Sequence, residues 1–314
     1  MGSENAAVKY AAFSLRDSYY SEMARHVIEA AQSRTNERCR TVVDLGAGIG
    51  MSTMELLRYA RRVIAVEPSD DMLEILNLNV MGDPRVQVLR GSGEGLYELL
   101  QKNFFEFQDL SDIMVDAVFC CQVFHLFNPP NKKSMVPDVL NQIAGVLEPG
   151  GVVAFDLGPS QYEFEMNLSN HRKEGRCFGE ILTELSHPLY QRAHEIAYRR
   201  VKEKVPRFRR KDLWPQPVTR MTFSFLAKAC EQAGFVDVRV KERTSPVSGM
   251  RIINFIRNGW SVWFRWISDD VLSVDAKNEI MRETVRELFE DGEFADMQKI
   301  ESYHPTAVFT AVRS

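Results

Sequence analysis

The chain has 314 residues, of which 45% are hydrophobic, so it can bury a substantial core as one large domain or as one domain with a smaller cap. Its formal net charge of -4 gives no general attraction to nucleic acids or anionic membranes, so such a partner would need a local basic patch. Its five cysteines lack the paired spacing of a zinc site or a disulfide framework, which is typical of a reducing, cytoplasmic environment.

The first twenty residues lack the basic and apolar regions of a signal peptide, and no window holds the roughly 18 apolar residues that cross a bilayer. We therefore expect no membrane insertion. The first predicted element is a helix over about residues 14–33, in which Met23, Val27, Ile28 and Ala31 recur at helical spacing.

From residue 41 onward, short β-branched runs alternate with helical stretches. Strands that alternate with helices predict parallel strands joined by right-handed crossovers, and hence a Rossmann-like open α/β sheet with helices on both faces. The runs are TVVDL (41–45), RVIAVE (62–67), RVQVLR (85–90), DAVFCC (116–121) and GVVAFDL (151–157).

Two insertions interrupt this alternation. One follows the fifth strand, and the other separates a strand at 236–240 from the last strand at 306–312. Both are expected at the carboxyl edge of the sheet, where ligands bind in such folds, so they are candidates for a mainly helical cap. The predicted segments are an N-terminal helical cover (1–40), a cofactor-binding core (41–157), a cap insertion (158–220), a core continuation (221–244), a second cap insertion (245–301) and a final core strand (302–314).

A glycine-rich loop follows the first strand. VVDLGAGIG places Asp44 at the end of the strand, ahead of glycines that permit positive φ and close approach of the backbone to a ligand. A dinucleotide fingerprint would need glycine where Met51 stands, so a pyrophosphate is not expected. Glu67 ends the second strand and is placed to accept hydrogen bonds from both hydroxyls of a ribose. Together these residues predict a nucleoside without phosphate, although the glycines alone would also suit a purely structural turn.

At these residues the chain resembles the class I S-adenosylmethionine-dependent methyltransferases of the small-molecule type. VVDLGAGIG is similar to their first motif, VIAVEPSDDML to the second, VLRGSGEGL to the third, DAVFCCQVFHLF to the fourth and VLEPGGVVAF to the turn into the fifth strand. Five motifs in order are far more specific than any one of them. The resemblance covers residues 40–157 tightly and implies a mostly parallel sheet with an antiparallel last strand, and S-adenosylmethionine as cofactor.

The same resemblance implies a donor site. Asp44 would orient the ammonium group of the methionine portion, which Gly46, Ala47 and Gly48 would line, and Glu67 would hold the ribose hydroxyls. Many relatives have Asp at the position of Ser92, so a carboxylate contact to the adenine amino group is not expected. The remaining implied contacts are Pro68 and Met72 near the ribose, Ser92, Gly93 and Glu94 beside the adenine, and Gln122 near the sulfonium.

The stretch QVFHLFNPPNKK (122–133) contains an Asn-Pro-Pro, which base- and amide-methylating relatives use to hold the target nitrogen. In those relatives the motif follows the fourth strand directly and precedes an aromatic residue. Here Asn128 comes several residues after the strand, and Asn131 follows the prolines. We therefore favour the pattern of the small-molecule relatives, in which this stretch is a histidine-containing loop and a proline begins the next helix.

Methyl transfer requires an acceptor in line with the sulfonium methyl, and a general base only if the acceptor is protonated. His125 lies where the fourth motif meets the pocket and is the candidate base, with backbone capping as the alternative. Glu163 and Glu165, in the first insertion, can face the acceptor or can be solvated. Tyr20, next to Tyr19, resembles aromatic residues that cover the donor, with core packing as the alternative.

Two further segments bear on the acceptor. RRVKEKVPRFRRK (199–211) carries eight basic residues and one acidic residue, and it can hold an anionic acceptor or an RNA backbone, although a solvated helix face is favoured. The segment 253–267, with Trp260, Trp263 and Trp266, can wall an apolar pocket, stabilise a cation, form a dimer surface or pack in the core. A prenyl diphosphate acceptor would fit both segments. No histidine or carboxylate cluster has metal-ligand spacing, so no metal is predicted.

The sequence thus predicts an enzyme that methylates a small, largely apolar metabolite of the kind made in secondary metabolism, with carbon or oxygen as the favoured acceptor atom. The small-molecule acceptor can be anionic, nucleic acid is not the expected partner, and a homo-oligomer is compatible with the aromatic segment. The alternatives are an RNA or protein methyltransferase, or a non-catalytic module that uses the same fold for binding.

Overall fold

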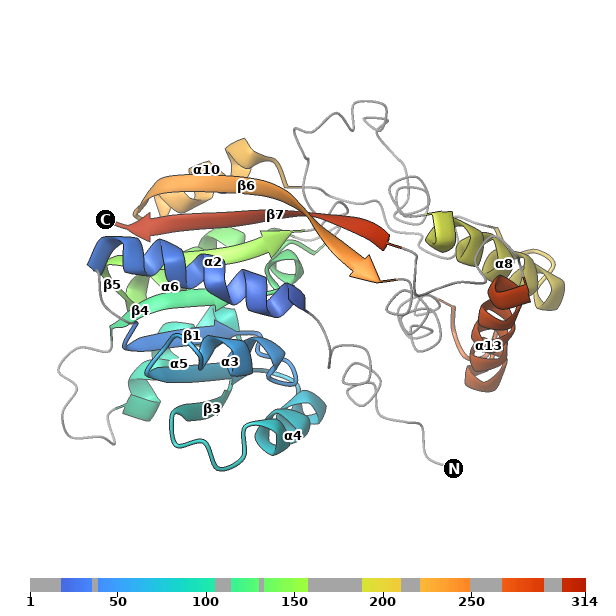
Figure 1. The fold of residues 1–314 in the computed structure, drawn as a ribbon, viewed down its shortest axis with the longest axis horizontal. Helices are drawn as coiled ribbons and strands as arrows, with labels where there is room; N and C mark the ends of the chain where they lie inside the picture. Colours follow the sequence, from blue (N-terminus) through green and yellow to red (C-terminus); the bar gives the residue numbers. More distant parts are fainter. Residues whose placement is uncertain are drawn as a thin grey trace.

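The computed structural model describes residues 18–35, 39–104, 114–129, 133–157, 188–209, 221–248, 267–290 and 301–314. These residues form a seven-stranded sheet in the order β3-β2-β1-β4-β5-β7-β6 (Figure 1). The first five strands pair in parallel, and β7 pairs antiparallel with both β5 and β6. The predicted open α/β sheet with an antiparallel last strand is confirmed. The strands are β1 Thr41–Leu45, β2 Arg62–Glu67, β3 Val86–Arg90, β4 Val115–Cys120, β5 Leu147–Leu157, β6 Phe235–Ser248 and β7 Glu301–Arg313.

Both faces of the sheet are covered by helices. Because of this, the central parallel strands are apolar almost without interruption, and side chains of alternating residues enter two separate cores. On one face α2 (Ser18–Thr35) and α3 (Met51–Leu56) pack over Val42, Val63 and Ala117, and α4 (Asp70–Asn79) lies beside them. On the other face α5 (Leu96–Phe104), α6 (Val136–Val146) and α10 (Phe223–Gln232) pack over Val43, Ile64 and Val118.

The N-terminal helix α2 packs on one face of the sheet. Met23, Val27, Ile28 and Ala31, which the sequence marked as its apolar stripe, are all buried against the strands. Figure 1 shows α2 lying across β4 and β5. The helix therefore reaches the part of the sheet where β4 and β5 end.

The last two strands are longer than predicted. β6 and β7 pair from Phe235↔Arg313 to Ser248↔Glu301, whereas β5 pairs with β7 only as far as Ala307. The remainder is a two-stranded ribbon that extends beyond the sheet (Figure 1). Its strands contain Pro246 and Pro305, and proline weakens the strand signal in a sequence. The second insertion is accordingly confined to residues 249–300.

Helices from the two insertions pack against each other. α8 (Pro188–Lys204) buries Ala193, Ile196, Ala197 and Val201, and α13 (Val274–Glu290) buries Ile280, Met281, Val285 and Leu288. Figure 1 shows the pair on the side toward which β5 runs, which is the side of the carboxyl ends of the parallel strands. Among the described helices, none combines the length and the hydropathy of a membrane span.

Candidate functional site

The loop after β1 leaves space for a ligand at one glycine. Gly46, Gly48 and Gly50 all have positive φ. A Cβ on Gly46 would lie 2.3 Å from Val123 Cγ2, and one on Gly50 would lie 2.6 Å from Leu76 Cδ1, so a side chain at either position would have to displace a packed neighbour. A Cβ on Gly48 would meet no described atom within 4 Å. Of the three, Gly48 is therefore the glycine whose backbone a ligand can approach.

The carboxylate of Glu67 is tied to this loop. Its Oε2 accepts a hydrogen bond from the backbone N–H of Gly48 at 2.9 Å, and its Oε1 accepts one from the N–H of Ser69 at 2.9 Å. Glu67 is buried at the end of β2, so the two bonds fix the carboxylate in one orientation. Each oxygen retains a second acceptor position, which is what a ribose diol requires.

Asp44 carries an unsatisfied buried oxygen. Its Oδ2 accepts hydrogen bonds from Ser52 Oγ at 2.7 Å and from Thr53 Oγ1 at 2.6 Å, whereas Oδ1 has no hydrogen-bond partner among the described residues. Burial, opposed by the two hydroxyls and reinforced by the charge of Glu67, raises the pKa of Asp44 to about 6. A buried acceptor without a donor is costly, so Oδ1 indicates that a ligand group or a water supplies the donor.

Gln122 is held between two elements distant from it in sequence. It is a non-glycine residue with a φ of 57°, and it follows β4 after one intervening residue. Its backbone N–H donates to Asp156 Oδ1 at 2.5 Å, and its Oε1 accepts from the hydroxyl of buried Tyr20 at 3.3 Å. Two predicted residues, Tyr20 and Gln122, are thus brought together.

Sequence reasoning missed three residues of this site. Ser52 and Thr53 lie in the first turn of α3, just after the glycine loop, and donate hydrogen bonds to Asp44, but small polar residues at the start of a helix ordinarily indicate only a helix terminus. Asp156 interrupts the apolar run of β5, where a single buried carboxylate is itself a signal, since such groups are rare unless they have a partner.

The other predicted donor contacts have these positions. Gly93 is buried, and a Cβ on it would lie 2.8 Å from Phe127 Cζ, so packing explains this glycine. Ser92 precedes the short 3-10 helix η1 (Gly93–Gly95). The roles of these residues beside a nucleoside stay predictions. Ala47 is buried, Ser92 and Met72 are half-buried, and Pro68 and Glu94 are exposed.

His125 lies in a turn that aromatic packing holds in place. The turn is the 3-10 helix η2 (Phe124–Phe127), in which the ring of Phe124 stacks on Phe155 with 3.8 Å between centroids. Asn128 is separated from β4 by this turn, and α6 has a proline in its first turn, as expected for the small-molecule pattern. The side chain of His125 is half-buried, and its role as a base stays a prediction. Glu163, Glu165 and the three tryptophans lie outside the described residues.

The part of the basic run that lies on α8 forms ion pairs with α13. Arg199 and Arg200 both pair with Glu287, the latter at 3.0 Å, and Lys204 pairs with Glu279 at 2.7 Å. Three of the eight basic residues of the run are therefore neutralised within the chain, which disfavours their use for an RNA backbone or an anionic acceptor.

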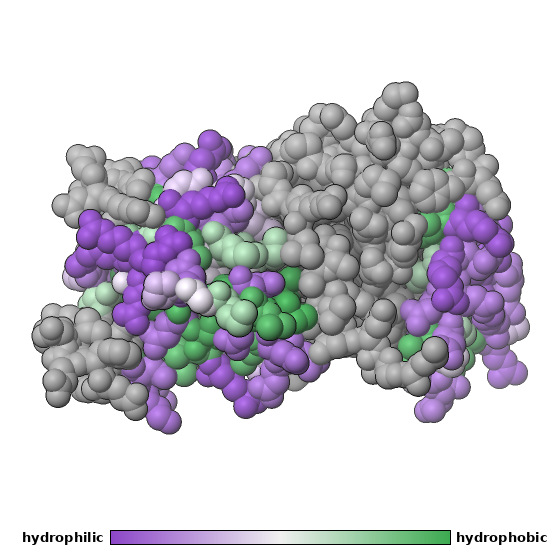
Figure 2. All heavy atoms as spheres, turned by 60° about the horizontal axis from the view of Figure 1, so that its bottom comes forward, coloured by the Kyte–Doolittle hydropathy of each residue, from purple (hydrophilic) through white to green (hydrophobic). Residues whose placement is uncertain are grey.

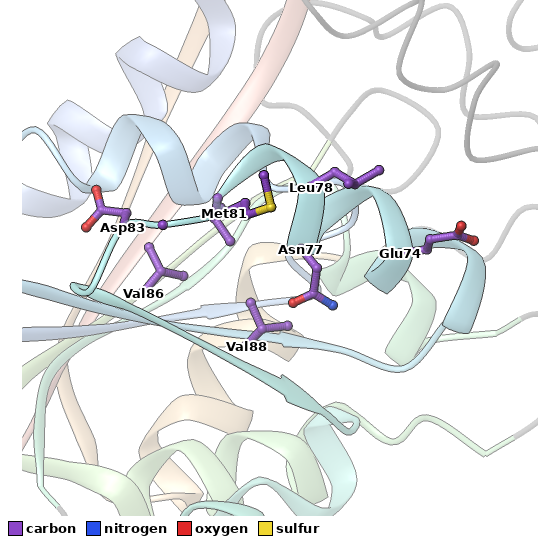
Figure 3. A pocket seen from close by; sticks show the side chains of 9 residues that line it. Glu74, Asn77, Leu78, Met81, Asp83, Val86 and Val88 are labelled. Carbon is purple, nitrogen blue, oxygen red and sulfur yellow. The ribbon is translucent and has the colours of Figure 1, made fainter.

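A groove of about 630 Å³ lies elsewhere, between α4 and β3 (Figure 3). None of the predicted donor contacts lines it, so it is not the candidate site. Figure 2, with the bottom of Figure 1 brought forward, shows hydrophobic residues among hydrophilic ones on this side, where Leu78 and Met81 are exposed. The groove is lined by Glu74, Asn77, Leu78, Val80, Met81, Gly82, Asp83, Val86 and Val88.

In the part of the chain that the structure describes, no group of three or more His, Cys, Asp or Glu residues could hold a metal ion.

A family model described as a methyltransferase domain matches residues 43–155, which run from β1 to β5 and contain the glycine loop, Glu67 and Gln122. Residues 43–155 are a methyltransferase domain. The resemblance to class I S-adenosylmethionine-dependent methyltransferases is confirmed, and S-adenosylmethionine is the methyl donor that the family implies.

The proteins of similar sequence are also methyltransferases by name. An uncharacterized methyltransferase of Mycobacterium tuberculosis is 31% identical over 136 residues, which are 43% of this chain and 44% of the relative. One from Oceanobacillus iheyensis is 26% identical over 176 residues, which are 54% of this chain and 70% of the relative. The chain thus spans less than half the length of the mycobacterial relative.

Two solved structures are similar over most of the chain. YcgJ of Bacillus subtilis has a TM-score of 0.45 at 14% identity, with 91% of this chain and 97% of YcgJ covered. A geranyl diphosphate methyltransferase in complex with GPP and sinefungin has a TM-score of 0.44 at 14% identity, with 94% and 77% covered. At these values the similarity carries no argument about the acceptor.

Proposed function

We propose that this protein transfers a methyl group from S-adenosylmethionine to a small, largely apolar molecule. The observation that carries the proposal lies at the carboxyl ends of β1 and β2. There the open side of Gly48, the fixed carboxylate of Glu67 and the unpartnered Oδ1 of Asp44 occur together. They fit the donor, because it offers a ribose diol to Glu67 and a cationic ammonium group to Asp44.

The residues of the chain would bind and orient the donor rather than perform bond chemistry. Bound S-adenosylmethionine supplies an electrophilic methyl group on a sulfonium. Glu67 would accept hydrogen bonds from the ribose hydroxyls, and Asp44 Oδ1 would accept one from the ammonium group or from an intervening water. Gln122, held by Tyr20, would close one side of the pocket and exclude water. Proximity and desolvation would then provide most of the rate enhancement.

The acceptor side of the proposal rests on the two insertions. The packing of α8 against α13 supports a common cap, because it joins residues of both insertions beyond the carboxyl ends of the strands. His125, Glu163 and Glu165 remain the proposed candidates for a base, which is needed only if the acceptor loses a proton. The pairing of Arg199, Arg200 and Lys204 with α13 engages three of the eight basic residues that motivated a nucleic-acid acceptor, so we prefer a small molecule.

Calorimetry with S-adenosylhomocysteine tests the donor site. Affinity in the micromolar range is expected, and Glu67→Ala should weaken it by about 1–3 kcal/mol through loss of charge-assisted hydrogen bonds. The matched control is Glu148→Ala. Glu148 is a carboxylate at the start of β5 that pairs with Arg40 at the opposite edge of the sheet, so its removal should leave the affinity unchanged.

The absence of binding by the wild-type protein would overturn the cofactor assignment. Turnover is tested separately by incubating the protein and S-adenosylmethionine with fractionated cell extract. A methylated product in an apolar, small-molecule fraction is expected. Binding of the donor without product from any fraction would instead favour a non-catalytic module.

A further inference from the structure

The backbone of Gln122 has a conformation that its own side chain does not favour. Among the described residues, only Gln122 and Asp237 have positive φ without being glycine. Asp237 has two ordinary reasons for this, because aspartate tolerates the left-handed region and because it lies where the pairing of β6 with β7 is irregular. Gln122 has neither reason, so contacts from its surroundings must hold it there.

Asp156 provides the backbone contact. The register of β4 and β5 pairs Cys120 with Phe155, which places Asp156 beside the point where the chain leaves β4. Asp156 is 4% exposed, and its Oδ1 accepts the backbone N–H of Gln122 at 2.5 Å. A short, charge-assisted bond in a buried position is among the stronger hydrogen bonds in proteins.

The turn that Asp156 holds is packed against the glycine loop. Val123 follows Gln122 directly, and its side chain occupies the space that a Cβ on Gly46 would need, at 2.3 Å. On the other side, the buried hydroxyl of Tyr20 donates to Gln122 Oε1 at 3.3 Å. A change in the backbone of Gln122 would therefore displace both the glycine loop and the side chain that faces Tyr20.

We propose that Asp156 is a positioning residue of the donor site, whose carboxylate holds Gln122 in its left-handed conformation and thereby fixes the glycine loop and the Gln122 side chain in the geometry that binds the donor. This inference rests on the proposed function. It gives a role to a residue that lies outside the five motifs on which the resemblance to methyltransferases rests.

The test compares two aspartates that make the same kind of bond at opposite ends of the sheet. Asp116 accepts the backbone N–H of Thr41 at 2.7 Å, at the start of β4. Asp156→Ala is expected to weaken the binding of S-adenosylhomocysteine at least about tenfold. Asp156→Asn, whose amide oxygen can accept the same N–H, should stay within about threefold of the wild type. Asp116→Ala should reduce thermal stability without changing the dissociation constant.

A second arm separates positioning from a general loss of structure. Glycine adopts positive φ readily, so in a Gln122→Gly background the backbone no longer depends on Asp156. The added effect of Asp156→Ala on affinity should then be at least about threefold smaller than in the wild-type background. If Asp156→Ala alone does not fold, recovery of a folded protein that binds S-adenosylhomocysteine in the Gln122→Gly background supports the proposal, and failure of both variants overturns it.

The other possible outcomes distinguish a failure of this inference from a failure of the proposed function. Wild-type affinity in Asp156→Ala, or an equal loss in both backgrounds, would overturn this inference alone. Absence of S-adenosylhomocysteine binding by the wild-type protein would overturn the proposed function and this inference with it.

Discussion

Alanine substitutions at two glycines, Gly48 and Gly82, can distinguish an effect on donor binding from an effect on the stability of the fold. Gly48 has a φ of 56° and Gly82 has a φ of 84°, and a Cβ on either would meet no described atom within 4 Å. Alanine in the left-handed region costs roughly 1–2 kcal/mol, so Gly48→Ala and Gly82→Ala should reduce the free energy of unfolding by similar amounts. For a chain of this size, we expect each melting temperature to fall by about 2–4 °C per kcal/mol.

The two variants should differ in affinity. Gly48 donates its N–H to Glu67, so a methyl group there would enter the space proposed for the donor. Forcing one methyl group into a well-packed contact costs about 1–3 kcal/mol, which corresponds to an increase of about 5- to 150-fold in the dissociation constant. Gly82 follows α4 and lines the groove of Figure 3, where none of the proposed donor contacts lies, so its variant should bind like the wild type.

Calorimetry with S-adenosylhomocysteine and thermal unfolding of the same three preparations check this. Wild-type affinity in Gly48→Ala would mean that no ligand approaches this glycine, which would refute the reasoning from its open side. An equal loss in Gly82→Ala would show that reduced stability, rather than the added methyl group, lowers the affinity.

Three further predictions concern charge. Because burial raises the pKa of Asp44 from 3.8 to about 6, the affinity for S-adenosylhomocysteine should fall as the pH drops through about 6, and Asp44→Asn should abolish this step; an identical pH profile in the variant would contradict it. The raised pKa of Asp44 also favours the folded state at low pH. Its contribution to the free energy of unfolding is fully present below about pH 4 and is lost as the pH rises through about 6. Glu287→Gln removes the partner of both Arg199 and Arg200, so it should lower the free energy of unfolding by about 1 kcal/mol in dilute buffer and by much less in about 1 M NaCl. Circular dichroism of thermal unfolding measures this, with Glu195→Gln on α8 as the control, and a difference that does not depend on salt would count against the ion pairs.

The sequence alone was sufficient for the sheet and for the residues at the centre of the proposed donor site. The five parallel strands are buried on both faces, which makes each a short apolar run that stands out between helical stretches. Asp44 and the glycine loop are contiguous, and Glu67 ends the very next strand. Parallel strands expose their carboxyl ends at one edge, so these residues had to meet once the strand order was known.

The supports of that site could be found only in the tertiary structure. The bond from Gln122 to Asp156 depends on the register of β4 against β5, and the bond from Tyr20 depends on how α2 crosses the sheet. Neither register nor crossing angle leaves a local pattern, because each is set by the packing of whole elements. The length of the β6–β7 ribbon was also missed, since strand pairing there outweighs the prolines that ordinarily indicate the end of a strand.

The basic run of α8 shows the same limit for charge. The sequence showed a dense run of positive charge, which could be solvated or could bind an anionic acceptor or an RNA backbone. For Arg199, Arg200 and Lys204 the structure supplied a different partner, the acidic side of α13, about 80 residues further along the chain and packed against α8 through buried apolar side chains. Charge attracts without regard to sequence distance, so the sequence determined which residues carry charge, and only the packing of the two helices decided what those charges bind.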